Sequence, residues 1–283
     1  MQVLKTGRNV HTVKMDLGSR NRREFWFLLR SDAHHDNLHC NWKLEKKHLD
    51  EAKKRKAGIL DFGDLYCAMQ GKWDKRSDKE QMRPEHQVNN YLDALVQTAT
   101  DFYEPYAKQF VVLGYGNHEI SILDRHSTDL LQSLASRLND RTGSHITTGG
   151  LSGYVRFRFS RGPHSQSKLL WYHHGSGGAS PITKGVGTTA RHAAFVSDAD
   201  IVCTGHTHTE YIVPLQRVKL SSSNRSEKTR QTHIRIPGYK DSWHDGAFGW
   251  ENLRGFAPTT VGACWLQFVV ESDHIETNTF LAT

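Results

Sequence analysis

The sequence predicts an α/β fold with a polar site along one edge of a β-sheet. Short apolar runs of strand length alternate with segments of helical periodicity, and longer strand-like runs fill the last third of the chain. Five of the apolar runs are followed directly by a small polar cluster. Ligands of open α/β sheets gather beyond the carboxyl ends of the strands, so these clusters are expected to lie close together.

The first half of the chain is expected to alternate strands and helices. Apolar runs predict strands at 25–30, entered from a basic arm, and at 59–62 and 110–113. A charged surface helix is expected at 42–57. Pro84 is expected to open a long helix to about residue 104, because proline suits the first turn and apolar residues recur behind it at helical spacing. A further helix is expected through Leu130, Leu131, Leu134 and Leu138.

The second half is expected to be dominated by strands. Period-two alternation at 154–159, a turn at Gly162-Pro163 and an apolar return at 169–172 predict a hairpin. A helix at about 188–198 and a strand at 200–203 follow. Further strands are expected at 211–220, 232–236, 261–270 and 274–281. Because no repeat and no Pro/Gly/Ser linker divides the chain, we expect a single domain over residues 1–283.

The composition describes a globular protein. Of the 283 residues, 37% are hydrophobic and 24% are charged, and no apolar run reaches the ~20 residues of a membrane-spanning helix, so we expect no membrane partner. The polar, basic N-terminal residues are unlike a signal peptide. The four cysteines are scattered without a CxxC pair, so we expect reduced thiols, a cytoplasmic protein and no thiolate metal site.

The charge balance favours an anionic partner. The formal net charge is +7, which attracts nucleic acid, nucleotides or phosphorylated surfaces, although many basic proteins bind no nucleic acid. The 18 histidines matter through their positions, since imidazole is the commonest metal ligand and the side chain that titrates nearest neutral pH.

The five polar clusters have the residue types of a metal site. In chain order they are Asp32-Ala33-His34, Gly63-Asp64, Gly116-Asn117-His118-Glu119, His173-His174-Gly175 and Gly205-His206-Thr207-His208. Alternate residues of an extended segment point the same way, so Asp32 with His34, and His206 with His208, are expected to chelate from one face of a strand end. Taken singly, the first three clusters are more often ordinary polar turns or loops, and the histidines of the fifth are as readily structural as ligands. The recurrence after five strands favours a distributed site.

The ordered set DxH, GD, GNHE, HHG and GHTH resembles the calcineurin-like metallophosphoesterase superfamily over positions 32 to 208. The resemblance implies an α/β sandwich of two mixed β-sheets flanked by helices, with a metal site at the carboxyl ends of the strands. It also implies two divalent metal ions. Mn²⁺ is the expected ion, and Fe, Zn²⁺ or Mg²⁺ are alternatives, since the donors are oxygen and imidazole without thiolate.

The resemblance implies seven ligands. One metal would be bound by Asp32, His34 and His208, the other by Asn117, His174 and His206, and both by a bridging Asp64 that belongs to the catalytic centre. In the fourth cluster either histidine could be the ligand. His174 is preferred because it directly precedes glycine, which leaves His173 beside the metal site or in contact with substrate.

His118 is implied as the catalytic acid that protonates the leaving group. Protein phosphatases of the superfamily continue the Gly-Asp motif as GDxVDRG, with an aspartate that orients this histidine. Here Cys67 stands in place of that aspartate. A phosphoserine phosphatase of that branch is therefore disfavoured, and the carboxylate partner of His118 is open between Asp36 and Asp124, with Asp36 alternatively a support or substrate contact.

Two segments are expected to decide the substrate. The basic loop 71–84 offers Lys72 and Arg76, and the aromatic loop 237–256 offers Trp243, His244, Trp250 and Arg254. Aromatic rings among basic residues can stack bases and grip phosphates. The alternative is a loop that packs over the sheet or forms a contact between protomers. The basic run 217–235 is more simply a solvated hairpin tip.

Three functions are open. The first is a phosphodiesterase that acts on nucleic acid or nucleotides by in-line attack of a metal-bridging hydroxide, which the charge and the aromatic loop favour. The second is a phosphomonoesterase for small molecules or proteins. The third is a non-catalytic binding scaffold, which is disfavoured because no ligand of the set is missing. The sequence leaves the oligomeric state open.

Overall fold

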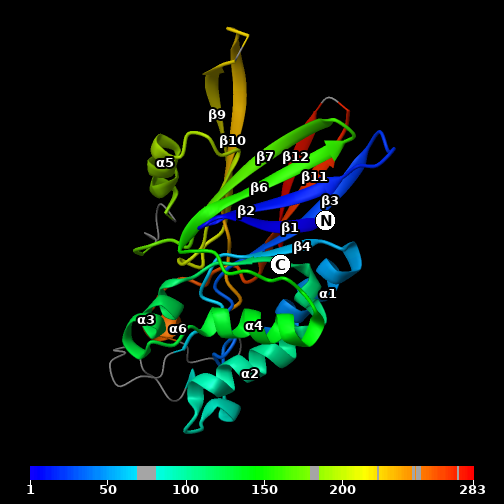
Figure 1. The fold of residues 1–283 in the computed structure, drawn as a ribbon. Helices are drawn as coiled ribbons and strands as arrows, with labels where there is room; N and C mark the ends of the chain where they lie inside the picture. Colours follow the sequence, from blue (N-terminus) through cyan, green and yellow to red (C-terminus); the bar gives the residue numbers. More distant parts are fainter. Residues whose placement is uncertain (69–80, 179–184, 222, 244–245, 247–249, 273) are drawn as a thin grey trace.

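Two mixed β-sheets pack face to face, and helices cover the outer face of one of them (Figure 1). The structure is a computed structural model that describes residues 1–68, 81–178, 185–221, 223–243, 246, 250–272 and 274–283. The prediction of an α/β sandwich of two mixed sheets flanked by helices is confirmed.

The larger sheet has seven strands in the order β1-β2-β6-β7-β8-β10-β9. Their bounds are β1 Gln2–Gly7, β2 Val10–Asp16, β6 Ser152–Arg161, β7 His164–His173, β8 Ile201–Thr204, β9 Tyr211–Leu220 and β10 Ser226–Arg235. β7, β8 and β10 run parallel to one another. β6 and β7 form the predicted hairpin. The β9–β10 hairpin projects beyond the rest of the sheet (Figure 1).

The smaller sheet has five strands in the order β12-β11-β3-β4-β5. Their bounds are β3 Arg23–Arg30, β4 Gly58–Asp61, β5 Phe110–Leu113, β11 Ala263–Val270 and β12 Ile275–Ala282. β3, β4 and β5 are parallel neighbours, so their carboxyl ends lie at the same edge.

The strands β4, β5, β8 and β11 are buried along their whole length, as is the second half of β3, which explains their continuous apolar runs. In β3, Phe27 and Leu29 point into the core between the sheets, and Leu28 points into the core under the helices. The ring centroid of Phe27 lies 4.7 Å from that of Phe157 in the opposite sheet. Burial of each such side chain stabilises the fold by about 1.5–3 kcal/mol, so this alternation holds the two sheets together.

The helices lie mainly against the smaller sheet (Figure 1). Their bounds are α1 Trp42–Arg55, α2 Tyr91–Tyr103, α3 Asn117–His126, α4 Leu130–Thr142, α5 Val186–Phe195 and α6 Trp250–Leu253, with 3₁₀ turns η2 Pro84–His86 and η3 Glu104–Gln109. α1, α2 and α4 supply the outer core cluster. No helix among the described residues has both the length and the apolar character to cross a membrane.

Three predicted elements are wrong. The basic arm before residue 25 forms β1 and β2, where His11, Val13 and Met15 are buried but lysine and threonine between them hide the alternation. The long helix from Pro84 is a 3₁₀ turn and a separate α2, since residues 87–90 are not helical. The residues after Gly116, where no helix was predicted, open the helix α3.

A buried ion network lies directly under the edge where β3 and β4 end. Arg30, fully buried, donates to Glu45 at 2.7 Å, and its Nε lies 2.7 Å from Asp61 Oδ2. Arg30 and Asp61 are register partners on β3 and β4, whereas Glu45 comes from α1. The hydroxyl of Tyr103 on α2 accepts from Arg30 at 2.9 Å and donates to Glu45. The network therefore ties two strand ends to two helices.

We expect Glu45→Gln to make stability less dependent on acid pH. Burial alone would raise the pKa of Glu45, but Arg30 and His35 lower it to about 2. A lowered folded-state pKa gives stability that is present above the ordinary value of 4.5 and lost as pH falls toward 2. The variant should unfold about 2–3 kcal/mol more easily at pH 7, and the difference should shrink below pH ~4.5.

Urea unfolding of both proteins between pH 7 and pH 3 measures this difference. The exposed Glu227→Gln is the matched control and should show no difference at any pH. A gap between Glu45→Gln and the unaltered protein that stays constant down to pH 3 would contradict the assignment.

Candidate metal centre

All five polar clusters follow strands whose carboxyl ends meet at one edge. Asp32 and His34 follow β3, Asp64 follows β4, and Asn117 follows β5 as the first residue of α3. From the larger sheet, His174 follows β7, and His206 and His208 follow β8. The two sheets thus bring the clusters together from separate parts of the sequence, as sequence analysis predicted.

The first group of ligand atoms is formed by Asp32, His34 and His208. These atoms all lie within 4.8 Å of one another. His34 Nε2 is 3.2 Å from His208 Nε2, and His208 Nε2 is 3.4 Å from Asp32 Oδ1. Asp32 and His34 are buried, and His208 is partly buried.

The second group is formed by Asp64, His174 and His206, again within 4.8 Å. His174 Nε2 lies 3.1 Å from Asp64 Oδ2 and 3.2 Å from the side-chain oxygen of Asn117. Because His174 Nδ1 donates to the carbonyl of Phe62 at 3.0 Å, its Nε2 is left to face the site.

The structure separates the two neighbouring histidines of the fourth cluster. His174 is fully buried beside Asp64. His173 Nδ1 accepts the backbone N–H of Gly175 at 2.8 Å, and its ring lies 5.9 Å from that of Trp171. The geometry therefore favours His174 as a ligand.

These donors fit divalent cations. Two imidazole nitrogens 3.2 Å apart can share only one proton, and Asp32 Oδ1 is buried without a hydrogen-bond donor among the described residues. A cation at the common point of these atoms would satisfy all of them. The thiol of Cys67 lies outside these two groups, in a third set of possible ligand atoms with His34 and His118. Burial and the charge of Asp36 raise its pKa to about 12, so without a metal the thiol stays protonated. The first two groups therefore offer oxygen and imidazole donors.

Five candidate ligands lie in the left-handed backbone region. They are Asp32 (φ 52°), His34 (φ 46°), Asp64 (φ 53°), His206 (φ 73°) and His208 (φ 51°). The prediction that Asp32 with His34, and His206 with His208, chelate as alternate residues of an extended segment is therefore wrong. The pairs converge because the chain turns sharply at each ligand, a conformation that clusters at functional sites.

Position 116 must be glycine because the side chain of Asp64, the predicted bridging ligand, lies directly against it. A Cβ on Gly116 would lie 2.0 Å from Asp64 Oδ1, which no side chain could occupy. Similarly, a Cβ on Gly205 would lie 2.1 Å from Ser31 Oγ and 2.5 Å from Asp32 Oδ2. The glycines of the GNHE and GHTH motifs thus allow the strand-end turns to pack against the carboxylates.

Glu119 organises the site, although sequence analysis assigned it no role. Its buried carboxylate accepts the backbone N–H groups of Asp64, Tyr66 and Gly116 at 3.1, 2.9 and 2.9 Å. Burial and the charge of Asp64 raise its pKa to about 8. Glu119 therefore fixes the turn that carries Asp64 to the start of α3.

Arg235 has a comparable role at the fifth cluster. It is buried and donates to the hydroxyl of Thr207 at 2.8 Å and to that of Thr188 on α5 at 2.7 Å. Sequence analysis placed it in a solvated basic run, which is wrong for this residue. The sequence shows that a residue in a β-hairpin is charged, but it does not show whether the side chain points into the protein.

The two aspartates among the candidate ligands, Asp32 and Asp64, favour the ionised form. Burial acts to raise the pKa of Asp32 and of Asp64, but the neighbouring imidazoles outweigh it and the pKa of both lies below the ordinary value. Burial acts to lower the pKa of His174, but the charge of Asp64 raises it to about 10. The negative charge of the two aspartates therefore favours a bound proton or a metal cation beside them.

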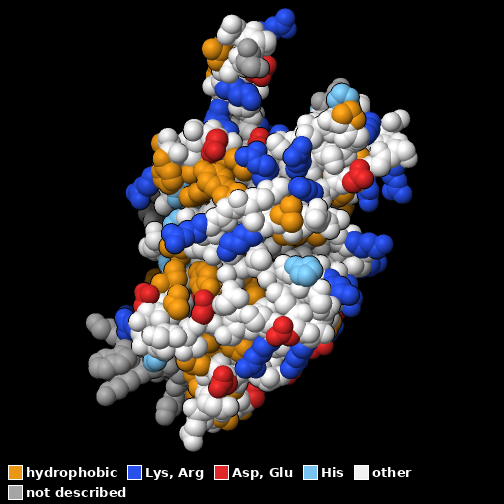
Figure 2. All heavy atoms as spheres, viewed as in Figure 1, with side chains coloured by type: hydrophobic (Ala, Val, Ile, Leu, Met, Phe, Trp, Pro, Cys, Tyr) orange, Lys and Arg blue, Asp and Glu red, His pale blue; other side chains and the backbone are white. Residues whose placement is uncertain are grey.

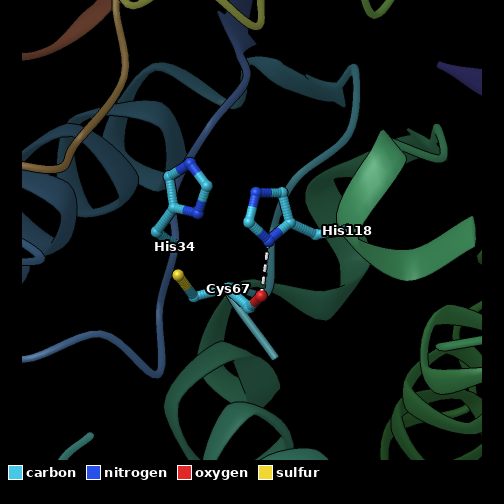
Figure 3. A group of neighbouring side chains, drawn as sticks. All are labelled: His34, Cys67 and His118. Atoms are coloured by element: carbon cyan, nitrogen blue, oxygen red, sulfur yellow. Dashed lines mark hydrogen bonds between the residues drawn. The ribbon is translucent and has the colours of Figure 1, made fainter. Parts of the chain in front are cut away.

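His118 lies beside the ligand groups. Its ring is 5.0 Å from that of His34, and its Nε2 is 3.7 Å from Asp64 Oδ2. Its Nδ1 donates to the main-chain carbonyl of Cys67 at 2.5 Å (Figure 3). Of the two carboxylates considered as partners, Asp124 is exposed on α3, and Asp36 accepts backbone N–H groups instead.

The structure describes only some of the predicted substrate residues. Lys72, Arg76 and His244, and the side chain of Trp250, lie outside the described residues. Trp243 and Arg254 are exposed. Tyr239 of the aromatic loop is buried, with its hydroxyl 3.0 Å from His48 Nδ1, so it cannot stack on a substrate.

The comparisons with known proteins concern overall shape alone. No family model and no curated protein matches the chain. Similar solved structures include a predicted phosphoesterase from Streptococcus pneumoniae TIGR4 (9% identity, 92% of this chain and 91% of that chain, TM-score 0.34). Vps29 complexed with Zn²⁺ from Entamoeba histolytica is 11% identical, with 92% of this chain and 100% of that chain covered and a TM-score of 0.37. GAP50, the anchor in the inner membrane complex of Plasmodium, is 10% identical, with 92% of this chain and 85% of that chain covered and a TM-score of 0.45.

At these identities and TM-scores, the likeness says nothing about activity, metal or partners. The chain's own strand order nevertheless has the two mixed sheets flanked by helices that the resemblance to calcineurin-like metallophosphoesterases implies.

Proposed function

We propose that this protein is a phosphoester hydrolase that uses two divalent metal ions. The observation that carries the proposal is the convergence of two compact ligand groups, one around Asp32 and one around Asp64, from four strand ends, with Asn117 joining them from a fifth. A non-catalytic scaffold would have no reason to retain buried, strained carboxylates and imidazoles at such a cost.

In this proposal one metal would be held by Asp32, His34 and His208, and the other by Asn117, His174 and His206. Asp64 would be shared by both, since its Oδ2 lies 3.1 Å from His174 Nε2 and its charge also acts on Asp32 and His34 of the other set. Bound divalent metals would polarise the phosphoryl group and activate water for in-line attack. Mn²⁺ is the expected metal, and Fe, Zn²⁺ and Mg²⁺ are alternatives that oxygen and imidazole donors also suit.

His118 supplies the proton that the leaving group needs. With Nδ1 held by the Cys67 carbonyl, Nε2 faces the site and can donate to a substrate oxygen. As the bond from phosphorus to the leaving oxygen breaks, the Nε2 proton moves to that oxygen, and the imidazole regains a proton from solvent.

The favoured substrates are phosphodiesters of nucleic acid or nucleotides. The net charge of +7 favours a polyanion. On the face drawn in Figure 2, Lys and Arg side chains gather over the strand-rich half and along the projecting hairpin. Trp243 and Arg254 of the aromatic loop are exposed, and an exposed indole ring is a surface on which a base can stack.

The test is metal-dependent turnover. Protein with Mn²⁺ is expected to hydrolyse bis(p-nitrophenyl) phosphate, and removal of metal by a chelator should abolish the reaction until Mn²⁺ is restored. Asn117→Ala and His206→Ala should each be inactive but folded. The exposed Asn89→Ala and His126→Ala are matched controls and should keep full activity.

A substrate panel then separates the classes. Single-stranded DNA, RNA, cyclic nucleotides and phosphopeptides, assayed beside p-nitrophenyl phosphate, should show diesters preferred over monoesters. The absence of metal-dependent turnover on every diester and monoester would refute the enzyme. A preference for monoesters would retain the enzyme and refute the phosphodiesterase.

A further inference from the structure

The aspartate that orients the catalytic histidine in protein phosphatases of the superfamily is absent here, yet a hydrogen bond still fixes the ring of His118. Cys67 stands where an aspartate was expected, and its thiol, with a pKa of about 12, carries no charge. Figure 3 shows the carbonyl oxygen of Cys67, not its sulfur, facing the ring nitrogen of His118. The sulfur instead lies 3.4 Å from the side-chain nitrogen of Asn37. The main chain therefore takes over the contact of the absent side chain.

The direction of that carbonyl is set from the other side of the same peptide unit. The peptide between Cys67 and Ala68 is planar and trans, so its C=O and its N–H point in opposite directions. The N–H of Ala68 donates to Asp36 Oδ2 at 2.8 Å. Binding that N–H on one side aims the Cys67 carbonyl at His118 on the other.

Asp36 also fixes the preceding peptide. Its Oδ1 accepts the N–H of Cys67 at 2.5 Å, so both carboxylate oxygens hold consecutive main-chain groups. Ala68 adopts φ 45°, which alanine rarely does unless its surroundings impose it. The hydroxyl of Tyr91 on α2 donates to Asp36 at 3.3 Å, and Asp36 itself is buried.

We propose that Asp36 is the positioning residue for His118, and that it acts through the Cys67–Ala68 peptide. The carboxylate orients the peptide and, because linked hydrogen bonds polarise one another, strengthens its carbonyl as an acceptor for the histidine. An Asp–peptide–His chain thus takes the place of a direct Asp–His contact. The inference rests on the proposed function, in which His118 protonates the leaving group.

The experiment varies the acidity of the leaving group. A poor leaving group needs a proton from His118, whereas an acidic phenol leaves without one. Diphenyl phosphate and bis(2,4-dinitrophenyl) phosphate are the two substrates. We expect Asp36→Asn, which can accept only one of the two N–H groups, to lower kcat on diphenyl phosphate by about ten- to hundredfold and to leave kcat on the dinitrophenyl ester within about threefold.

Two comparisons make the result specific. His118→Ala should show the same selectivity, and the double variant should be no slower than His118→Ala alone, because both act on one step. Asp124→Asn, the exposed carboxylate on the helix of His118, is the matched control and should match the unaltered protein on both substrates. Metal content, measured by atomic emission, should be equal in all variants.

A second measurement does not depend on turnover. In ¹⁵N-histidine NMR spectra, the Nδ1–H signal that disappears in His118→Ala should shift in Asp36→Asn and should be retained in Asp36→Glu. Equal losses on both substrates, additive losses in the double variant, or an unchanged Nδ1–H signal would overturn the role of Asp36. If His118→Ala itself shows no selectivity between leaving groups, the proposed role of His118 fails instead.

Discussion

Replacing Asp64 by asparagine is expected to cause a loss of activity as severe as the loss of any other metal ligand. The carboxylate of Asp64 contacts His174 and lies within 3.7 Å of His118, while its charge also acts on Asp32 and His34. The amide would remove the negative charge that offsets two cations. A loss of several kcal/mol of transition-state stabilisation corresponds to a decrease of about 10³-fold or more in kcat/KM.

The measurement is kcat/KM on bis(p-nitrophenyl) phosphate at saturating Mn²⁺, together with the bound metal per protein. Asp140→Asn, an exposed aspartate on α4, is the matched control and should be unaffected. The circular dichroism of Asp64→Asn should equal that of the unaltered protein, since the amide has the same shape. Activity within tenfold of the unaltered protein would contradict a bridging role.

Replacing Arg30 by methionine is expected to cause the largest loss of stability. Arg30 is fully buried between Glu45 and Asp61, and its removal leaves both carboxylates buried without their cation. Breaking a buried ion pair in this way costs about 3–5 kcal/mol, which lowers Tm by roughly 10 °C in a chain of this size. The exposed Arg225→Met is the matched control and should leave Tm unchanged.

The combined variant Arg30→Met/Glu45→Gln/Asp61→Asn separates charge from packing. It keeps similar side-chain volumes and leaves no charge within the network, and the new amide at position 61 still offers an oxygen to accept the N–H of Gly63. It should therefore be more stable than Arg30→Met alone, as measured by urea unfolding. If it is no more stable, the loss in Arg30→Met comes from packing and not from unpaired carboxylates.

The fold and the ligand groups could be predicted because they depend on side-chain types along the chain. A run such as Phe27 to Leu29 is apolar because it is buried on both faces, and Asp32 and His34 stand out directly behind it. The backbone at these ligands could not be predicted in the same way. Asp and His are compatible with both extended and left-handed conformations, and the turn is imposed by contacts with the neighbouring strand end, such as the bond from Asp32 N–H to the Gly63 carbonyl.

The parts of the site that sequence analysis missed act through the main chain or through distant packing. Every residue has a main-chain carbonyl, so the sequence does not show that the carbonyl of Cys67 is the partner of His118. Glu119 was visible in the GNHE motif, but its three acceptor contacts are with main-chain N–H groups from two loops. Such contacts exist only once β4 and β5 are neighbours.

The left-handed backbone at five candidate ligands links metal binding to folding. Each such residue costs about 1 kcal/mol or more, so together they consume free energy of the same order as the net stability of a typical domain. A cation that binds only the folded chain returns stability in proportion to the logarithm of its concentration. The metal-free chain would therefore be the form most exposed to unfolding and proteolysis, and metal supply would govern how much folded protein a cell retains.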